Sequence, residues 1–126
     1  MNPLHDDDGK LAVPTVLLLC TDLMFAVQLQ NMAKQVGVRS VNARPGLPLP
    51  PADLMVVDLA ARVNVPAAIR EAVSMGTRVI AFGPHMDAEG RRAAKEAGAA
   101  RVLANSNLTR DLSLILSELK AGEGKE

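Results

Sequence analysis

The sequence predicts a single-domain α/β protein, built as a doubly wound, five-stranded parallel sheet with helices on both faces. Short apolar stretches alternate five times with segments of helical periodicity along the chain. These stretches are continuous instead of alternating with polar residues, as expected for parallel strands that are buried on both faces. A length of 126 residues suits one such domain, with right-handed connections between the strands.

The first strand and helix follow from the segment that begins at residue 15. TVLLLC, residues 15–20, is a short apolar run and is predicted to be a buried strand. Residues 21–37 are predicted to be a helix, with Thr21 or Asp22 as its N-cap and Gly37 as its stop. The apolar stripe of this helix is formed by Phe25, Leu29, Met32, Ala33 and Val36.

The connection after the second predicted strand, residues 39–43, is rich in proline. RPGLPLPPA, residues 44–52, contains four prolines. Proline has no amide donor and restricts the residue before it, so a full helix is not expected there. We expect an extended or irregular crossover in its place.

The second half of the chain repeats a strand–helix pattern. The predicted strands cover residues 53–59, 77–82 and 100–104, and the predicted helices cover residues 64–76, 87–99 and 107–122. Pro66 lies in the first turn of the helix over 64–76, and Gly76 ends it. The last helix presents an apolar face formed by Leu108, Leu112, Ile115, Leu116 and Leu119.

Composition excludes several classes of protein. Lys+Arg and Asp+Glu both total 14, and aromatic residues make up only 2% of the chain. The basic face and the stacking aromatics of a nucleic-acid-binding protein are therefore not expected. A single cysteine, Cys20, excludes an internal disulfide and a cysteine-based zinc cluster.

The two ends of the chain are predicted to lie outside the folded domain. Residues 1–13 are expected to be a flexible acidic tail, residues 14–121 the domain, and residues 122–126 a disordered C-terminus. The acidic start does not resemble a secretory signal, and the longest apolar run, residues 16–20, is too short to span a bilayer. We therefore expect a cytoplasmic protein without membrane contact.

Candidate functional residues follow the carboxyl ends of the strands, where open α/β sheets bind their ligands. Asp58 ends the third predicted strand, and a buried carboxylate there requires partners. The other residues of this predicted rim are Cys20, Thr21, Asp22, Gly83, His85, Asn105 and Ser106.

Three motifs between residues 15 and 120, namely MVVDL, RVIAFG and AAKEAGAARVLANSNL, together resemble the receiver domains of bacterial response regulators. MVVDL matches the family's third strand, which ends in the phosphorylated aspartate and places Asp58 at that position. RVIAFG and AAKEAGAARVLANSNL resemble the family's fourth strand and the segment that leads through its fifth strand. The resemblance implies a flavodoxin-like fold with strand order 2-1-3-4-5, in which the second helix is short or missing.

The chain departs from the receiver pattern at the phosphorylation site. The acidic pair that holds Mg²⁺ in receivers falls on Cys20 and Thr21, and only Asp22, one place along, is acidic. Gly83 replaces the family's Ser or Thr, and Asn105-Ser106 replaces its Lys-Pro pair. Phosphoryl transfer to a carboxylate brings negative charges together, and Mg²⁺ and Lys normally neutralise them.

These departures predict a degenerate, non-catalytic receiver-like signalling or adaptor domain that acts through protein–protein contacts. We expect no bound metal, no cofactor and no standard phosphorylation. One alternative is an atypical phosphoswitch, phosphorylated on Asp58 with Asp22 sharing the metal. Another is a small-molecule-binding flavodoxin-like protein with a phosphate held at the first helix.

Four of the rim residues also have a purely structural interpretation. Asp58 is then a strand-end acid bonded to loop amides or Asn105, Asp22 a helix N-cap, Cys20 a small buried residue and His85 a solvent-facing imidazole. We expect the structure to separate these interpretations from the functional ones.

Two surfaces are candidates for partner binding. The resemblance implies a homodimer through the family's fourth helix, fifth strand and fifth helix. Arg91, Arg92 and Lys95 form either a solvated helix face in this region or a site for an acidic partner. Met24, Val27 and Leu114 lie off the main apolar stripes of the first and last helices, which indicates broad burial or a contact patch.

Overall fold

The computed structural model describes residues 13–44 and 46–122. Five strands form one parallel sheet in the order β2-β1-β3-β4-β5, as predicted. The strands are β1 (Thr15–Leu19), β2 (Arg39–Asn42), β3 (Leu54–Asp58), β4 (Arg78–Gly83) and β5 (Arg101–Ala104). The helices are α1 (Leu23–Val36), α2 (Val65–Ser74), α3 (Ala88–Ala97) and α4 (Leu108–Ala121), with a short 3-10 turn, η1, over Asn105–Asn107.

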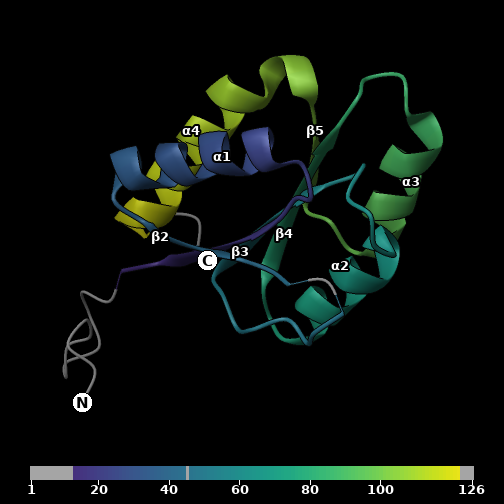
Figure 1. Ribbon diagram of the computed structural model, residues 1–126, viewed down its shortest axis with the longest axis horizontal. Helices are drawn as coiled ribbons and strands as arrows, with labels where there is room; N and C mark the ends of the chain where they lie inside the picture. The colour runs from purple at the N-terminus through teal and green to yellow at the C-terminus, as the bar shows by residue number, and fades with distance from the viewer. Residues whose placement is uncertain (1–12, 45, 123–126) are drawn as a thin grey trace.

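Helices cover both faces of the sheet. Figure 1 shows α1 and α4 on one face and α2 and α3 on the other. Within the described residues no helix is long and apolar enough to cross a membrane. The predicted tail lies outside these residues except for Val13, and the predicted disordered C-terminus lies outside them except for Gly122, which caps α4.

Local chemistry moves several element boundaries by one or two residues. The Asp22 carboxylate accepts hydrogen bonds from the Met24 and Phe25 amides at 2.9 and 3.2 Å, so α1 begins at Leu23 and Asp22 is its cap. β4 includes Gly83 because this residue still pairs with Ala104 of β5.

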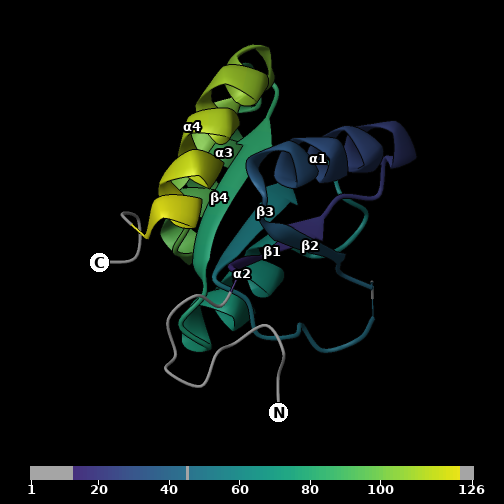
Figure 2. The same ribbon diagram turned by 90° about the vertical axis from the view of Figure 1, so that its left-hand side faces the viewer.

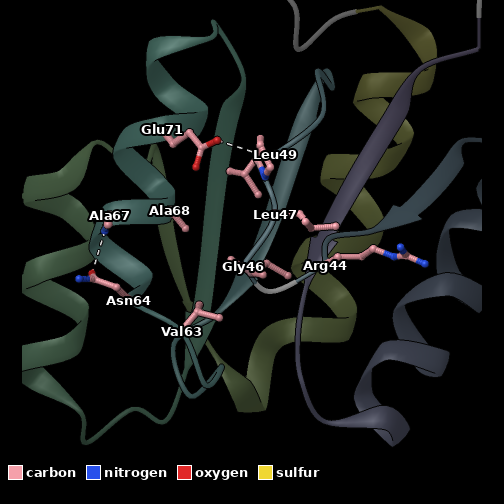
Figure 3. A pocket seen from close by; sticks show the side chains of 11 residues that line it. Arg44, Gly46, Leu47, Leu49, Val63, Asn64, Ala67, Ala68 and Glu71 are labelled. Atoms are coloured by element: carbon pink, nitrogen blue, oxygen red, sulfur yellow. Dashed lines mark hydrogen bonds between the residues drawn. The ribbon is translucent and has the colours of Figure 1, made fainter.

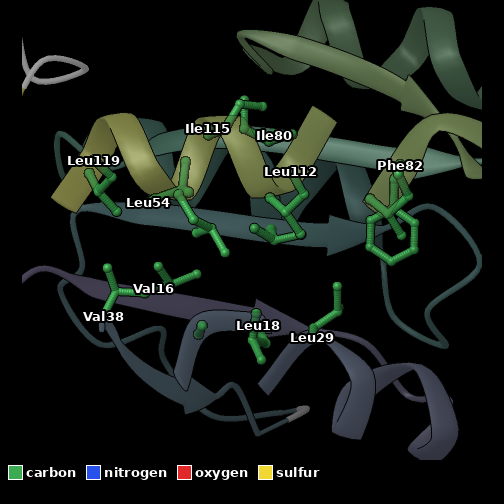
Figure 4. Close-up of a cluster of buried hydrophobic side chains, with 14 of the residues drawn as sticks. Val16, Leu18, Leu29, Val38, Leu54, Ile80, Phe82, Leu112, Ile115 and Leu119 are labelled. Carbon is green, nitrogen blue, oxygen red and sulfur yellow. The ribbon is translucent and has the colours of Figure 1, made fainter. Parts of the chain in front are cut away.

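Two apolar layers form the core, one on each face of the sheet. Because successive strand residues point to opposite faces, Val16 and Leu18 of β1 pack toward α1 and α4, whereas Leu17 and Leu19 pack toward α2 and α3. Figure 4 shows the α1/α4 layer, where Ile115 and Leu112 lie over the sheet. Because all five strands are parallel, their carboxyl ends lie at one edge of the sheet.

The proline-rich connection contains no helix in its described part, as predicted. Leu49 takes part in covering the sheet, since its side chain is buried in the α2/α3 layer. Its amide donates a hydrogen bond of 2.9 Å to the Glu71 carboxylate of α2 (Figure 3). Between this connection and α2 lies a groove of about 480 Å³ with apolar walls that include Leu19, Leu47 and Val63.

Replacing Leu49 by alanine tests whether this segment acts as core. We expect Leu49→Ala to lower the free energy of unfolding by about 2–3 kcal/mol, because it removes buried apolar atoms and leaves a cavity. Leu47→Ala is the matched control in the same connection, since Leu47 is 54% exposed. Urea unfolding measures both variants, and equal losses would contradict the assignment.

Candidate functional site

The carboxyl ends of the strands surround an open hollow of about 410 Å³. Its lining brings together four of the predicted rim residues, Thr21, Asp22, Asp58 and Asn105. It also includes Phe25, Ala60, Arg62 and Pro84. Phe25 packs edge-to-face against Phe82 of β4, with ring centroids 5.2 Å apart, and this contact holds the start of α1 against the sheet.

Asp58 ends β3 and is buried, with 7% of its surface exposed. One carboxylate oxygen accepts a hydrogen bond of 2.9 Å from the Ala60 amide. The other lies 3.5 Å from the thiol of Cys20. Among the described residues, no hydrogen bond joins Asp58 to Asn105 and no ion pair joins it to a cation. Asp58 therefore relies on one amide and one weak donor.

Cys20 lies beside Asp58 and is half-buried. The pKa of its thiol is raised to about 11, mainly by burial; a backbone hydrogen bond at Asp22 lowers this pKa in part, and the negative charge of Asp58 contributes to the rise. A thiol with such a pKa stays protonated at neutral pH, so it can donate to Asp58 and is a poor nucleophile.

Arg62 is a lining residue that the sequence reasoning missed. The turn after β3 folds back on itself, with the Ala61 amide bonded to the Asp58 carbonyl at 2.9 Å. The Arg62 amide then donates a hydrogen bond of 3.2 Å to the Thr21 hydroxyl across the hollow. The sequence contains a signal for Arg62, since it is a cation four residues after a strand-end acid. The predicted rim covered only the residues next to each strand end.

Gly83 lies against Leu59 and has no free space for a side chain. A Cβ atom at position 83 would lie 2.7 Å from Leu59 Cδ1 and 3.0 Å from Leu59 Cβ. Leu59 therefore occupies the space that a side chain at position 83 would need.

Two of the predicted rim residues lie apart from the hollow. His85 and Ser106 are exposed and do not line it. Ser106 lies in η1, a 3-10 turn that begins directly after β5 and was not predicted. Asn105 lines the hollow but supplies no charge there.

The magnesium ion that the resemblance implies does not fit the groups present. Mg²⁺ prefers several oxygen ligands in near-octahedral geometry. Here a protonated thiol lies against one oxygen of Asp58, and the Asp22 carboxylate accepts two amide hydrogen bonds as the cap of α1. Within residues 13–44 and 46–122, no three His, Cys, Asp or Glu side chains lie close enough together to hold a metal ion.

Solved structures with the same fold are receiver domains. The receiver domain of a sensor histidine kinase from Pseudomonas aeruginosa, with a magnesium ion in its active-site cleft, is 20% identical (TM-score 0.72; 88% of this chain and 99% of that one). A Francisella response regulator receiver domain is 16% identical (TM-score 0.70; 86% and 98%). HP1043, an orphan response regulator of Helicobacter pylori, is 14% identical (TM-score 0.64; 87% and 96%).

The high coverage and TM-scores of these matches establish the fold. Because the identities are low, the matches establish the fold alone. No protein-family model matches the sequence, and neither does any curated protein. The chain has the flavodoxin-like fold of response regulator receiver domains, as predicted.

The raised pKa of Cys20 predicts slow alkylation. At pH 8 a pKa of about 11, against an ordinary 9.0, lowers the thiolate fraction about 100-fold, so iodoacetamide should label the folded protein correspondingly slowly. Labelling should speed up as the pH approaches 11. Asp58→Asn removes a negative charge and should lower the pKa, while burial keeps it above 9.0. An unchanged pH–rate profile in Asp58→Asn would contradict the Cys20–Asp58 contact.

The close packing of Leu59 on Gly83 predicts a strong coupling between the two positions. Gly83→Ala should lower the free energy of unfolding by about 1–3 kcal/mol, because Leu59 must move aside. In a Leu59→Ala background the same substitution should cost much less, since only the Cβ atom of residue 59, at 3.0 Å, then remains close to the new side chain. Denaturant unfolding of the four proteins measures the coupling, and additive effects would contradict the packing.

Proposed function

We propose that this protein is a receiver-like signalling or adaptor domain that acts through protein contacts, without Mg²⁺-dependent phosphorylation of Asp58. One observation carries the proposal: the group beside the Asp58 carboxylate is a thiol with a raised pKa instead of a second acid. A metal ion would have to displace a protonated thiol to reach this oxygen. The proposal includes a cytoplasmic location and no enzymatic activity.

Charge supports the proposal. A phosphoryl group on Asp58 would place further negative charge beside Asp22. In receivers a metal ion and a lysine neutralise that charge, and together they supply most of the stabilisation of phosphoryl transfer. In this chain the residue at the lysine position is Asn105, which can donate a hydrogen bond but is uncharged.

The packing of Leu59 against Gly83 supports the same conclusion. In receivers the hydroxyl at the end of the fourth strand is positioned to meet the phosphoryl group. Here that position is a glycine whose side-chain space is filled by Leu59. A phosphoryl group on Asp58 would therefore meet no side-chain hydroxyl at position 83.

An acidic protein is the partner that best suits the face formed by α3, β5 and α4. Arg92 is engaged by Glu89 and Glu96 at 3.8 Å, whereas Lys95 and Arg101 are exposed without an ion pair in the described part of the chain. Complementary charge speeds association and selects the partner. The homodimer through this face, the family's fourth helix, fifth strand and fifth helix, stays a prediction.

Arg62 is the observation that favours the alternative, an atypical phosphoswitch. Its side chain lines the hollow together with Asp22 and Asp58, so it brings one cation near the acceptor. We rank this function second, because Arg62 forms no ion pair with either carboxylate among the described residues and the Asp22 carboxylate is already used as a helix cap.

Acyl phosphate labelling tests the proposal. The protein is incubated with acetyl phosphate and MgCl2, and intact-protein mass spectrometry measures the fraction that gains one phosphoryl group. We expect no labelling, because the countercharges are missing. A receiver domain that has the acidic pair and the lysine is the positive control.

Two variants identify the residues responsible for any labelling that is found. Labelling that disappears in Asp58→Asn would contradict the proposal and establish the phosphoswitch. Labelling that disappears in Arg62→Gln as well would show that Arg62 supplies the countercharge. Arg62→Lys, which keeps the positive charge, is the matched control.

A further inference from the structure

The proline-rich connection between β2 and β3 is buried at every third residue. Leu49 is buried, and Ala52, three residues later, packs against the same α2/α3 layer. The four residues around Leu49 are exposed: Leu47, Pro48, Pro50 and Pro51. A polyproline II helix has three residues per turn, so residues i and i+3 lie on the same edge. The burial pattern therefore indicates polyproline II geometry over residues 47–52, with one edge in the core.

The other two edges of this segment face outward. Pro48 and Pro51 are three residues apart and form one edge, and Leu47 and Pro50 form the other. We call these four residues the proline ridge. In Figure 2 the connection after β2 runs along the outside of the molecule, at the lower right of the view. The ridge is therefore open to a partner.

The core holds the ridge in place from the inside. The Leu49 amide donates its hydrogen bond to the Glu71 carboxylate at 2.9 Å, and the Thr77 hydroxyl donates to the Ala52 carbonyl at 3.0 Å. Proline also fixes the φ angle of each residue at which it stands. A segment that already has its bound conformation loses little conformational entropy when a partner binds. The ridge is therefore preorganised for recognition.

The chemistry of the ridge selects one kind of partner. Three of its four residues are prolines, which have no amide N–H, so an added β-strand cannot pair with it. The ridge carries no charge, so an acidic or basic surface gains no ion pair there. Polyproline II segments are recognised by grooves that are lined with aromatic side chains. Such a groove is the partner surface that suits the ridge.

A second copy of this chain cannot supply an aromatic groove. The chain contains no Trp, no Tyr and two Phe. Phe82 is fully buried in the core, and the ring of Phe25 packs against it edge-to-face. The aromatic side chains must therefore come from a different protein.

The groove of about 480 Å³ between the connection and α2 lies beside the ridge. Leu47 and Pro48 border it on the side of the connection, and Ala67 borders it on the side of α2 (Figure 3). This groove leaves room next to the ridge for a large side chain of the partner, with apolar walls on both sides.

We propose that the proline ridge binds a partner protein through a groove lined with aromatic side chains on that partner. One aromatic ring of the partner packs on Pro48 and extends into the groove beside α2. This inference goes beyond the proposed function, because it adds a second surface and the chemistry of its partner. It does not depend on the state of Asp58, which the acetyl phosphate experiment tests separately.

Titration with proline-recognition domains tests the proposal. Purified SH3 and WW domains, which carry aromatic-lined grooves, are added to the ¹⁵N-labelled chain, and amide NMR shifts measure binding. We expect at least one of these domains to bind. Its shifts should centre on the amides of Leu47, Leu49 and Ala52 in the connection and of Ala67 across the groove.

Pro48→Ala and Pro51→Ala should each weaken this binding about tenfold, because each removes a ring from the same outward edge and frees its φ angle. Leu114→Ala is the matched control, since Leu114 is also an exposed apolar residue but lies on α4, across the sheet. It should leave binding unchanged.

Circular dichroism and urea unfolding confirm that each variant is folded. The proposal is overturned if no domain binds, if the shifts centre on another surface, or if both proline variants bind as tightly as the unmodified chain.

Discussion

The buried carboxylate of Asp58 imposes the main constraint on the functional end of this fold. A carboxylate at the end of a strand that is covered on both faces loses water, so nearby donors must replace it. In this chain the donors are the Ala60 amide and the Cys20 thiol. The thiol can donate only while it is protonated, and burial raises the pKa of the Cys20 thiol, which keeps it protonated. The pair is therefore self-consistent without a metal ion.

The loops around the hollow are tied to each other by short contacts. The turn after β3 is joined to the segment after β1 through Arg62 and Thr21, and to β4 through the packing of Leu59 on Gly83. A switch needs two arrangements of similar free energy, each favoured by a different ligand state. Filling the space above Gly83 with a leucine favours one arrangement. This packing supports our proposal that the domain acts through its surfaces and not through a change at Asp58.

Besides the proline ridge, two surfaces of different character remain for binding. The α3, β5 and α4 face offers exposed cations, which suit an acidic protein, whereas Leu23, Met24 and Val27 of α1 form an exposed apolar surface. α1 and α4 lie on one side of the sheet and α2 and α3 on the other (Figure 1).

The order of the elements, the parallel sheet and the lack of a helix in the described part of the proline stretch could all be predicted from the sequence, because they follow from apolar runs, helical spacing and the missing amide of proline. The sequence also placed Asp58 at the edge where Thr21, Asp22 and Asn105 meet. Three contacts could be found only in the folded structure: Cys20 bonds Asp58, Leu59 fills the space at Gly83, and Arg62 lines the hollow. These contacts join different strands and loops, and their geometry depends on how the chain turns between them, which residue spacing does not encode.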